Sequence, residues 1–265
     1  MATTVRFYPS HSNSIHYKNI VSWTDLVDDT YVGSPTGTAG SKNLNVGDLN
    51  LRFESGLYFS ANNVTGGKKW EELSRLAFLF NTTSLPDTLS VTGVTLSLRI
   101  RSLTNSSESG WNPNYKIAPY NYNPDATGDI ATTEYDNFAD LLIGNEINDE
   151  DLEATQRITF TFTDTAWIKA DATSSVGVRF DLDTSYNPPS WLAENFTEIL
   201  FYDHNATTSD RPYIEVTYED ATALSLTFDE RVGTPTTTTP GSVTGTISTL
   251  SSDLVSYYKI FVEDQ

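Results

Sequence analysis

Residues 75–100, RLAFLFNTTSLPDTLSVTGVTLSLRI, decide the fold of this chain. They hold a short apolar run, a Leu-Pro-Asp turn and a longer run in which apolar and polar residues alternate. A period of two is typical of a strand with one buried face. Pro86 presets its φ angle and Asp87 can bond its own backbone, which favours a turn between two strands. The buried row predicted for the second strand is Val94, Leu96, Leu98 and Ile100.

A second signature, DRPYIEVTYE, lies at residues 210–219. Ile214 and Val216 alternate with polar residues, and Pro212, which has no N–H for a sheet, belongs at the start of the strand or on an edge. Alternation recurs at 157–163 (RITFTFT) and 176–183 (VGVRFDLD). Such runs, separated by clusters of Gly, Pro, Asn and Asp, are typical of antiparallel sandwiches. The sequence therefore predicts an all-β protein built as an antiparallel β-sandwich.

Other segments give weaker local patterns. Further strands are predicted at residues 5–8, 15–17, 49–53 and 57–60. Residues 134–147 (EYDNFADLLIGNEI) predict a helix with an apolar face formed by Phe138, Leu141 and Leu142, which ends at Gly144. Residues 163–169 (TDTAWIK) predict one helical turn, capped by Thr163 or Asp164, that buries Trp167.

The chain is predicted to consist of a sandwich, residues 1–219, and a small C-terminal β appendage, residues 220–265. In the appendage, LSLTF (224–228) and YYKIFV (257–262) are strand-like, and a Thr-, Pro- and Gly-rich linker separates them. A single strand pair is not stable alone, so it needs a partner: the sandwich, another copy or another protein. The predicted assembly residues are Leu224, Leu226, Phe228, Tyr257, Tyr258, Ile260 and Phe261.

Composition excludes several classes of protein. Of the 265 residues, 38% are hydrophobic and 12% aromatic, which is enough for a packed core. The net charge of −19 disfavours nucleic acids and anionic membranes as partners. No apolar run approaches the roughly 20 residues of a spanning helix, and MATTVRFYPS lacks the layout of a signal peptide. There is no cysteine, hence no disulfide or thiol chemistry.

No enzyme motif is present in the sequence. Residues 241–245 (GSVTG) place Ser wrongly for a nucleophile elbow, and residues 66–69 (GGKK) lack the spacing and the Ser/Thr of a phosphate loop. His11 and His16 are five residues apart and no Cys accompanies them, so they do not indicate a transition-metal site. We therefore predict that the protein is not an enzyme.

An acidic loop is the candidate site for an ion. Asp125 and Asp129 lie in a loop that also holds Asn121 and Asn123, and hard cations bind several oxygen ligands of this kind. The alternative is that these carboxylates are solvated turn residues. Calcium is the one ion that the pattern suggests, and no other cofactor is predicted.

Aromatic residues set among Asn and Pro are candidates for sugar binding, because exposed rings can stack on pyranose rings. The candidates are Trp111, Tyr115, Tyr120, Tyr122 and Trp191. The alternative, which we favour, is that these rings pin long loops to the sandwich.

The order of the motifs resembles the DNRLRE family of jelly-roll domains, which are related in fold to carbohydrate-binding modules. The resemblance covers roughly residues 1–219 and is strongest over 75–100 and 157–219. The chain differs from the family pattern in two respects: its N-terminal third is longer, and it shows no signal peptide. The matching elements are Arg75 before an apolar strand, Leu85-Pro86, strand 91–100, strand 157–163, Trp167, strand 176–183 and Arg211-Pro212 before the last strand.

Domains of this type also look like those of phage head and tail appendage proteins. The resemblance thus implies a virion component, assembled in the cytoplasm of a bacterial host. The first hypothesis is a non-catalytic structural protein of a tailed phage: a capsid decoration, head fibre or tail-associated protein, homo-oligomeric and bound to other virion proteins. The alternative is a carbohydrate-binding module that recognises a polysaccharide, and a virion decoration could also bind a surface glycan.

Overall fold

The computed structural model divides the chain into two units, Met1–Asp220 and Ala221–Gln265. All residues that it describes belong to the first unit. These are residues 2–21, 41–45, 49–55, 70–105, 114–124, 130, 136–184 and 196–220.

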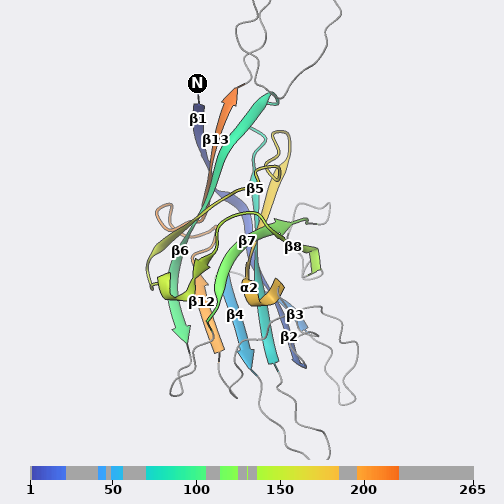
Figure 1. The fold of residues 1–265 in the computed structure, drawn as a ribbon, viewed down its shortest axis with the longest axis vertical. Helices are drawn as coiled ribbons and strands as arrows, with labels where there is room; N and C mark the ends of the chain where they lie inside the picture. The colour runs from blue at the N-terminus through green and yellow to red at the C-terminus, as the bar shows by residue number, and fades with distance from the viewer. Residues whose placement is uncertain are drawn as a thin grey trace, which may run out of the picture. The chain divides into compact units, whose positions relative to one another are not determined.

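The first sheet is built on the long strand predicted from the alternation. Figure 1 shows three of its strands, β1, β13 and β6, side by side. β13 pairs with the first part of β6, and β10 pairs with β6 as well. Pro212 immediately precedes β13, as predicted. The strands are β1 (Ala2–Phe7), β6 (Leu89–Asn105), β10 (Arg157–Thr161) and β13 (Tyr213–Asp220).

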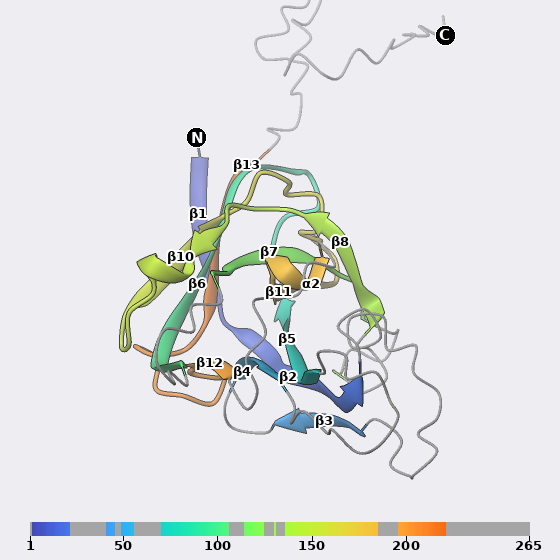
Figure 2. The same cartoon turned by 60° about the horizontal axis from the view of Figure 1, so that its bottom comes forward.

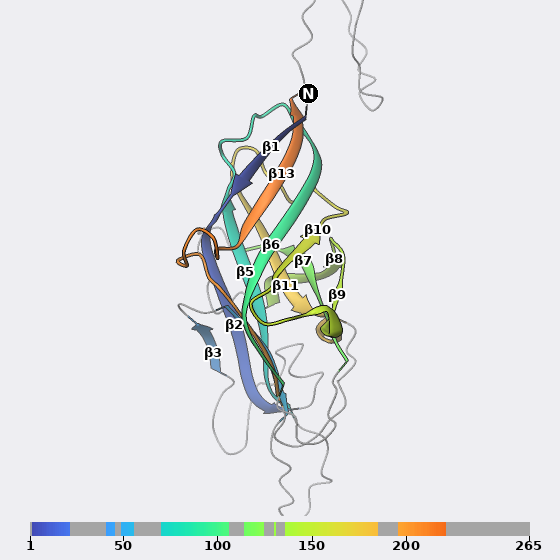
Figure 3. The same cartoon turned by 90° about the vertical axis from the view of Figure 1, so that its left-hand side faces the viewer.

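The second sheet runs in the order β12-β4-β5-β11-β7-β8, with β2 along β5 and β3 along β2. The end of β6 pairs with β12, whereas the first part of β6 lies beside β13 (Figure 3), so β6 takes part in both sheets. The strands are β2 (Pro9–Val21), β3 (Ser41–Asn45), β4 (Leu49–Ser55), β5 (Trp70–Asn81), β7 (Lys116–Tyr122), β8 (Phe138–Leu142), β9 (Ile147–Asn148), β11 (Thr173–Phe180) and β12 (Phe196–Phe201).

The all-β antiparallel sandwich is confirmed. The four apolar side chains predicted to be buried in β6 are at most 2% exposed, and Ile214 and Val216 of β13 are fully buried. They share one core with the apolar rows of β5 and β11. Burying each such side chain contributes roughly 1.5–3 kcal/mol, so the alternating strands are the main source of stability.

The helix predicted over residues 134–147 is wrong in its described part, 136–147, which holds β8 and β9. Phe138 is buried, whereas Leu141 and Leu142 are 56% and 40% exposed, so no apolar helical face exists. Gly144 does not end a helix but pairs with Phe162 in a close bridge. A Cβ there would lie 2.9 Å from a backbone oxygen, that of Thr161.

The prediction for residues 163–169 is partly correct. Trp167 is buried, and Asp164 caps the segment by accepting the N–H of Ala166 at 2.8 Å. The N–H of Ile168 donates to the carbonyl of Thr165 at 3.1 Å. The segment therefore forms a hydrogen-bonded turn, and the predicted turn of helix is not present.

Other strand predictions differ in extent. The strand predicted at 176–183 ends at Phe180, and its last residues begin the short helix α2 (Asp181–Thr184), which lies beside β7 (Figure 2). β3, β7 and β12 were not predicted. A short 3-10 helix, η2 (Asp149–Asp151), follows β9. Residues 57–60 lie outside the described residues.

Replacing Gly177 by Ala is expected to destabilise the sandwich by about 1–3 kcal/mol, because the new Cβ would overlap the buried ring of Phe138. Urea unfolding measures the loss. The matched control is Gly93→Ala in β6, where the nearest atom to the added Cβ is Thr217 Cβ at 3.9 Å. Equal losses in both variants would contradict the packing of Phe138 on β11.

Candidate functional site

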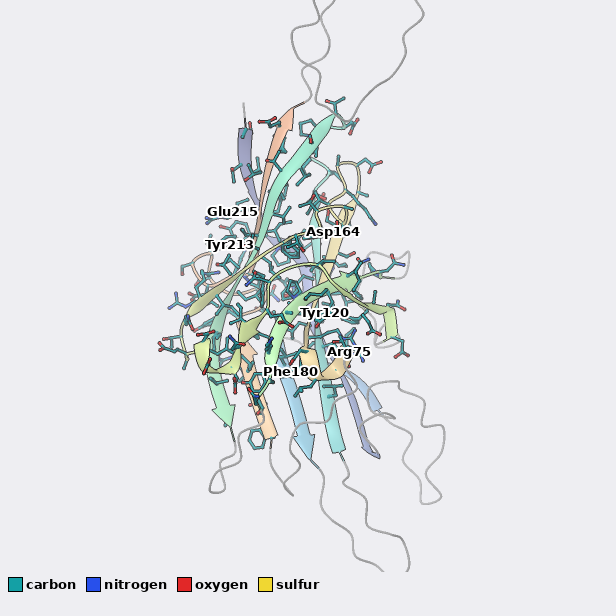
Figure 4. The ribbon with its side chains drawn as sticks, in the orientation of Figure 1. Arg75, Tyr120, Asp164, Phe180, Tyr213 and Glu215 are labelled. Atoms are coloured by element: carbon teal, nitrogen blue, oxygen red, sulfur yellow. The ribbon has the colours of Figure 1, made fainter. Side chains whose placement is uncertain are left out.

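The side of the second sheet opposite the β5 and β11 apolar rows carries charged residues. In β11, Gly177 and Arg179 alternate with Val176, Val178 and Phe180. Gly177 is opposite Ala77 of β5 and Tyr120 of β7, so by alternation Arg75, Arg179 and Tyr120 share one side. The three side chains are buried nonetheless. Figure 4 labels Arg75 and Tyr120 of this group.

A carboxylate from α2 joins the two arginines. Arg75 donates from Nε and Nη2 to the two oxygens of Asp183, at 2.8 and 2.7 Å. Arg179 donates from Nε to Asp183 Oδ2 at 2.7 Å. The side-chain exposures are 3% for Arg75, 2% for Arg179 and 0% for Asp183. The carboxylate thus accepts three charge-assisted hydrogen bonds away from water.

Asp140 of β8 adds a second anion to the cluster. Arg179 Nη1 lies 3.0 Å from Asp140 Oδ1, and it also donates to the carbonyl of Ala139 at 3.3 Å. The cluster therefore contains two guanidinium groups and two carboxylates, and it connects β5, β11, α2 and β8. Its charges are balanced, which a buried group of ions requires.

The protonation state of Asp183 follows from its surroundings. Burial raises the pKa of this carboxyl, but the charges of Arg75 and Arg179 and their hydrogen bonds outweigh burial and lower the pKa to about 2. Asp183 is thus ionised at neutral pH. A proton carrier in catalysis needs a pKa near the working pH, so Asp183 is suited to holding strands together and not to acid–base chemistry.

The three described tyrosines among the sugar-binding candidates are core residues. Tyr115, Tyr120 and Tyr122 are 1%, 2% and 1% exposed. Tyr122 packs on Phe138 with ring centroids 4.7 Å apart, and Arg179 lies 5.4 Å from the ring centre of Tyr120. The rings are packed against the sandwich, as the favoured alternative expects, but Tyr120 and Tyr122 lie on β7 and not on a long loop.

Other predicted site residues lie outside the described residues. They are Trp111, Trp191, Asp125, Asp129, Leu224, Leu226, Phe228, Tyr257, Tyr258, Ile260 and Phe261.

Asn105, the last residue of β6, pairs with Thr197 of β12. In the sequence, residues 106–113 follow Asn105, and residues 185–195 come shortly before Thr197. These two segments carry Trp111 and Trp191.

Arginines also fix the loop between β12 and β13, residues 202–212. Arg157 of β10 donates to the carbonyl oxygens of Ser209 at 2.6 Å and Arg211 at 3.3 Å. Arg211 Nε donates to the carbonyl of Ala206 at 2.6 Å. The Arg-Pro motif before β13 therefore has a structural reason: its arginine closes the loop, and its proline begins the strand.

The ring of Tyr213, the first residue of β13, is in contact with two guanidinium groups. The guanidinium carbons of Arg6 and Arg157 are 4.0 and 5.1 Å from its ring centre. Arg6 also forms an ion pair of 2.6 Å with Glu215, but both side chains are more than a third exposed, so the pair adds little stability. Figure 4 labels Tyr213 and Glu215.

The charged cluster of Arg75, Arg179, Asp183 and Asp140 was not predicted from the sequence. A usable signal exists: Arg75 and Arg179 are the only basic residues of β5 and β11, each lies next to apolar residues, and arginine is rarely buried unless it is paired. Arg75 and Asp183 are 108 residues apart in the sequence, so no local pattern predicts that they pair.

The described residues contain neither a metal-binding group of three or more side chains nor a membrane-spanning helix. In that part of the chain, no group of three or more His, Cys, Asp or Glu residues could hold a metal ion. Within the same residues, no helix has the length and apolar character to cross a membrane.

No protein-family model matches the chain, and no curated protein matches it. The resemblance to DNRLRE-type domains therefore stays a prediction.

Replacing Asp183 by Asn is expected to cost about 3–5 kcal/mol at pH 7, because two buried guanidinium groups lose their anion. A folded-state pKa of about 2, against 3.8 ordinarily, means that the stabilisation is complete above pH 3.8 and is lost as pH falls through 2. The pH-dependent part is about 2 kcal/mol. Urea unfolding between pH 7 and pH 2 measures both quantities.

The matched control is Asp140→Asn, the same chemical change at a carboxylate that is 60% exposed, with an expected loss below about 1 kcal/mol. The difference in unfolding free energy between wild type and Asp183→Asn should narrow as pH falls below 4. A difference that is independent of pH would contradict the low pKa of Asp183.

Proposed function

We propose that the chain is a non-catalytic structural protein of a virus particle: a head decoration, fibre or tail-associated protein of a tailed phage, built on a DNRLRE-type jelly-roll domain. The observation that carries the proposal is the division of the chain. A complete sandwich ends with β13 at Asp220, and a separate unit, Ala221–Gln265, continues from it. The second unit contains two apolar strand-like runs suited to pairing with another sheet edge.

The chemistry of the described sandwich supports a structural role. Its fully buried carboxylate, Asp183, is held by Arg75 and Arg179, and its buried tyrosines pack against neighbouring rings. The polar groups buried in this cluster stabilise the fold and are not poised for proton transfer. A folded sandwich followed by a second unit with apolar strand-like runs fits a particle component that binds other virion proteins and copies of itself.

Replacing Leu226 or Ile260 by Asp in the full-length chain is expected to reduce the oligomer to a monomer, because a carboxylate on a pairing strand must be desolvated. Light scattering measures the mass. Thr238→Asp in the Thr-rich linker adds the same charge and should leave the oligomer intact. A wild-type chain that is monomeric, or equal loss of the oligomer in all three variants, would contradict this assembly role.

A carbohydrate-binding module is the second candidate, and the pairing of Asn105 with Thr197 favours it. This pairing places the attachment points of the two Trp-bearing segments at neighbouring strands.

Under this second candidate, Trp111→Ala or Trp191→Ala should weaken polysaccharide binding by about 1–3 kcal/mol without unfolding the protein. Affinity electrophoresis on a polysaccharide panel measures the change. Tyr120→Phe is the control, because that ring is only 2% exposed and should not contact a ligand. An equal effect of Tyr120→Phe, or no binding by the wild type, would remove this candidate.

A further inference from the structure

Two histidines that are far apart in the sequence meet in the structure. His11 belongs to β2 and His204 to the loop between β12 and β13, and their ring centroids are 6.3 Å apart. The contact is fixed by the backbone, because the N–H of His204 donates to Ser12 Oγ at 3.0 Å. Ser12 is next to His11 and only 2% exposed, so the loop is attached to β2 beside the first imidazole.

The same nitrogen of each ring is engaged by a serine. His204 Nδ1 lies 3.0 Å from Ser12 Oγ, and His11 Nδ1 lies 3.3 Å from Ser10 Oγ. When Nδ1 carries the proton and donates it to the hydroxyl oxygen, Nε2 keeps its lone pair. Among the described residues, neither Nε2 has a hydrogen-bond partner. A hydrogen bond at the second nitrogen is the usual way in which a protein orients a metal-binding histidine.

The loop that carries His204 is held in one conformation. Asp203, only 5% exposed, accepts the N–H of Asn205 at 3.0 Å, and its carbonyl accepts the N–H of Ala206 at 3.3 Å. Both histidines are partly exposed, so an ion can reach them from water. The site thus combines fixed backbones with accessible nitrogen atoms.

We propose that His11 and His204 form a two-histidine site for a divalent transition-metal ion, with water in the other coordination positions. Imidazole nitrogens suit Zn²⁺, Ni²⁺ and Cu²⁺, whereas hard cations prefer oxygen ligands. A metal–nitrogen bond of about 2 Å on each side places two ring centres roughly 5–6 Å apart, close to the observed 6.3 Å. The net charge of −19 raises the concentration of cations near the protein. A bound ion would join β2 to the loop before β13.

Isothermal titration of the untagged full-length protein with CuCl₂, NiCl₂ or ZnCl₂ tests the site. We expect one ion per chain, with Cu²⁺ bound most tightly and no binding of Mg²⁺. His11→Ala and His204→Ala should each lower the affinity at least tenfold, and the double variant should not bind. The third histidine supplies the control: His16→Ala should bind as the wild type does.

A second measurement needs no variant. Zn²⁺ should shift the imidazole NMR signals of His11 and His204 and leave those of His16 unchanged, and it should raise the Tm of the protein. Binding that survives in the double variant, that is lost equally in His16→Ala, or that shifts all three imidazoles alike would overturn the proposal. So would the absence of stoichiometric binding by the wild type.

Discussion

The second sheet depends on one constraint: the buried ions of its charged cluster must all be paired. Removing an ion from water costs several kcal/mol, and only a nearby opposite charge with good hydrogen-bond geometry offsets that cost. Asp183 meets both conditions through Arg75 and Arg179. The cluster also fixes register, since a slip of one residue in β11 would turn Arg179 toward the opposite side of the sheet.

The same constraint explains why residues 138–142 form an edge strand. Arg179 has donors left after it binds Asp183, and β8 supplies Asp140 and the carbonyl of Ala139. The extended chain also brings Phe138 onto the backbone of Gly177, where any larger residue would collide with the ring. These contacts outweigh a local pattern that fits a helix. Two exposed leucines on β8 are the result.

The limits of sequence-based prediction follow from the range of each interaction. Alternation is local, so the buried rows of β6 and β13 could be predicted from neighbouring residues alone. Asp183, the partner of Arg75, is 108 residues away, and Ser12 and His204 are 192 residues apart, beyond the range of any periodic signal. Burial of Tyr120 was equally out of reach, because alternation says which residues share a side but not whether another segment covers that side.

The charged cluster and the histidine pair differ in whether they have a hydrogen-bonding atom left for a ligand. This difference suits the first to a structural role and the second to binding. Each Asp183 oxygen accepts a hydrogen bond from an arginine, and the side chains of Arg75, Arg179 and Asp183 are at most 3% exposed, so a ligand could reach Asp183 only by breaking the fold. The imidazole rings of His11 and His204 are each hydrogen-bonded at Nδ1, and neither Nε2 has a partner among the described residues. A polar atom that is held in place, reachable from water and not yet bonded is what a ligand requires. In the described sandwich, the histidine pair meets these requirements and the buried ion cluster does not.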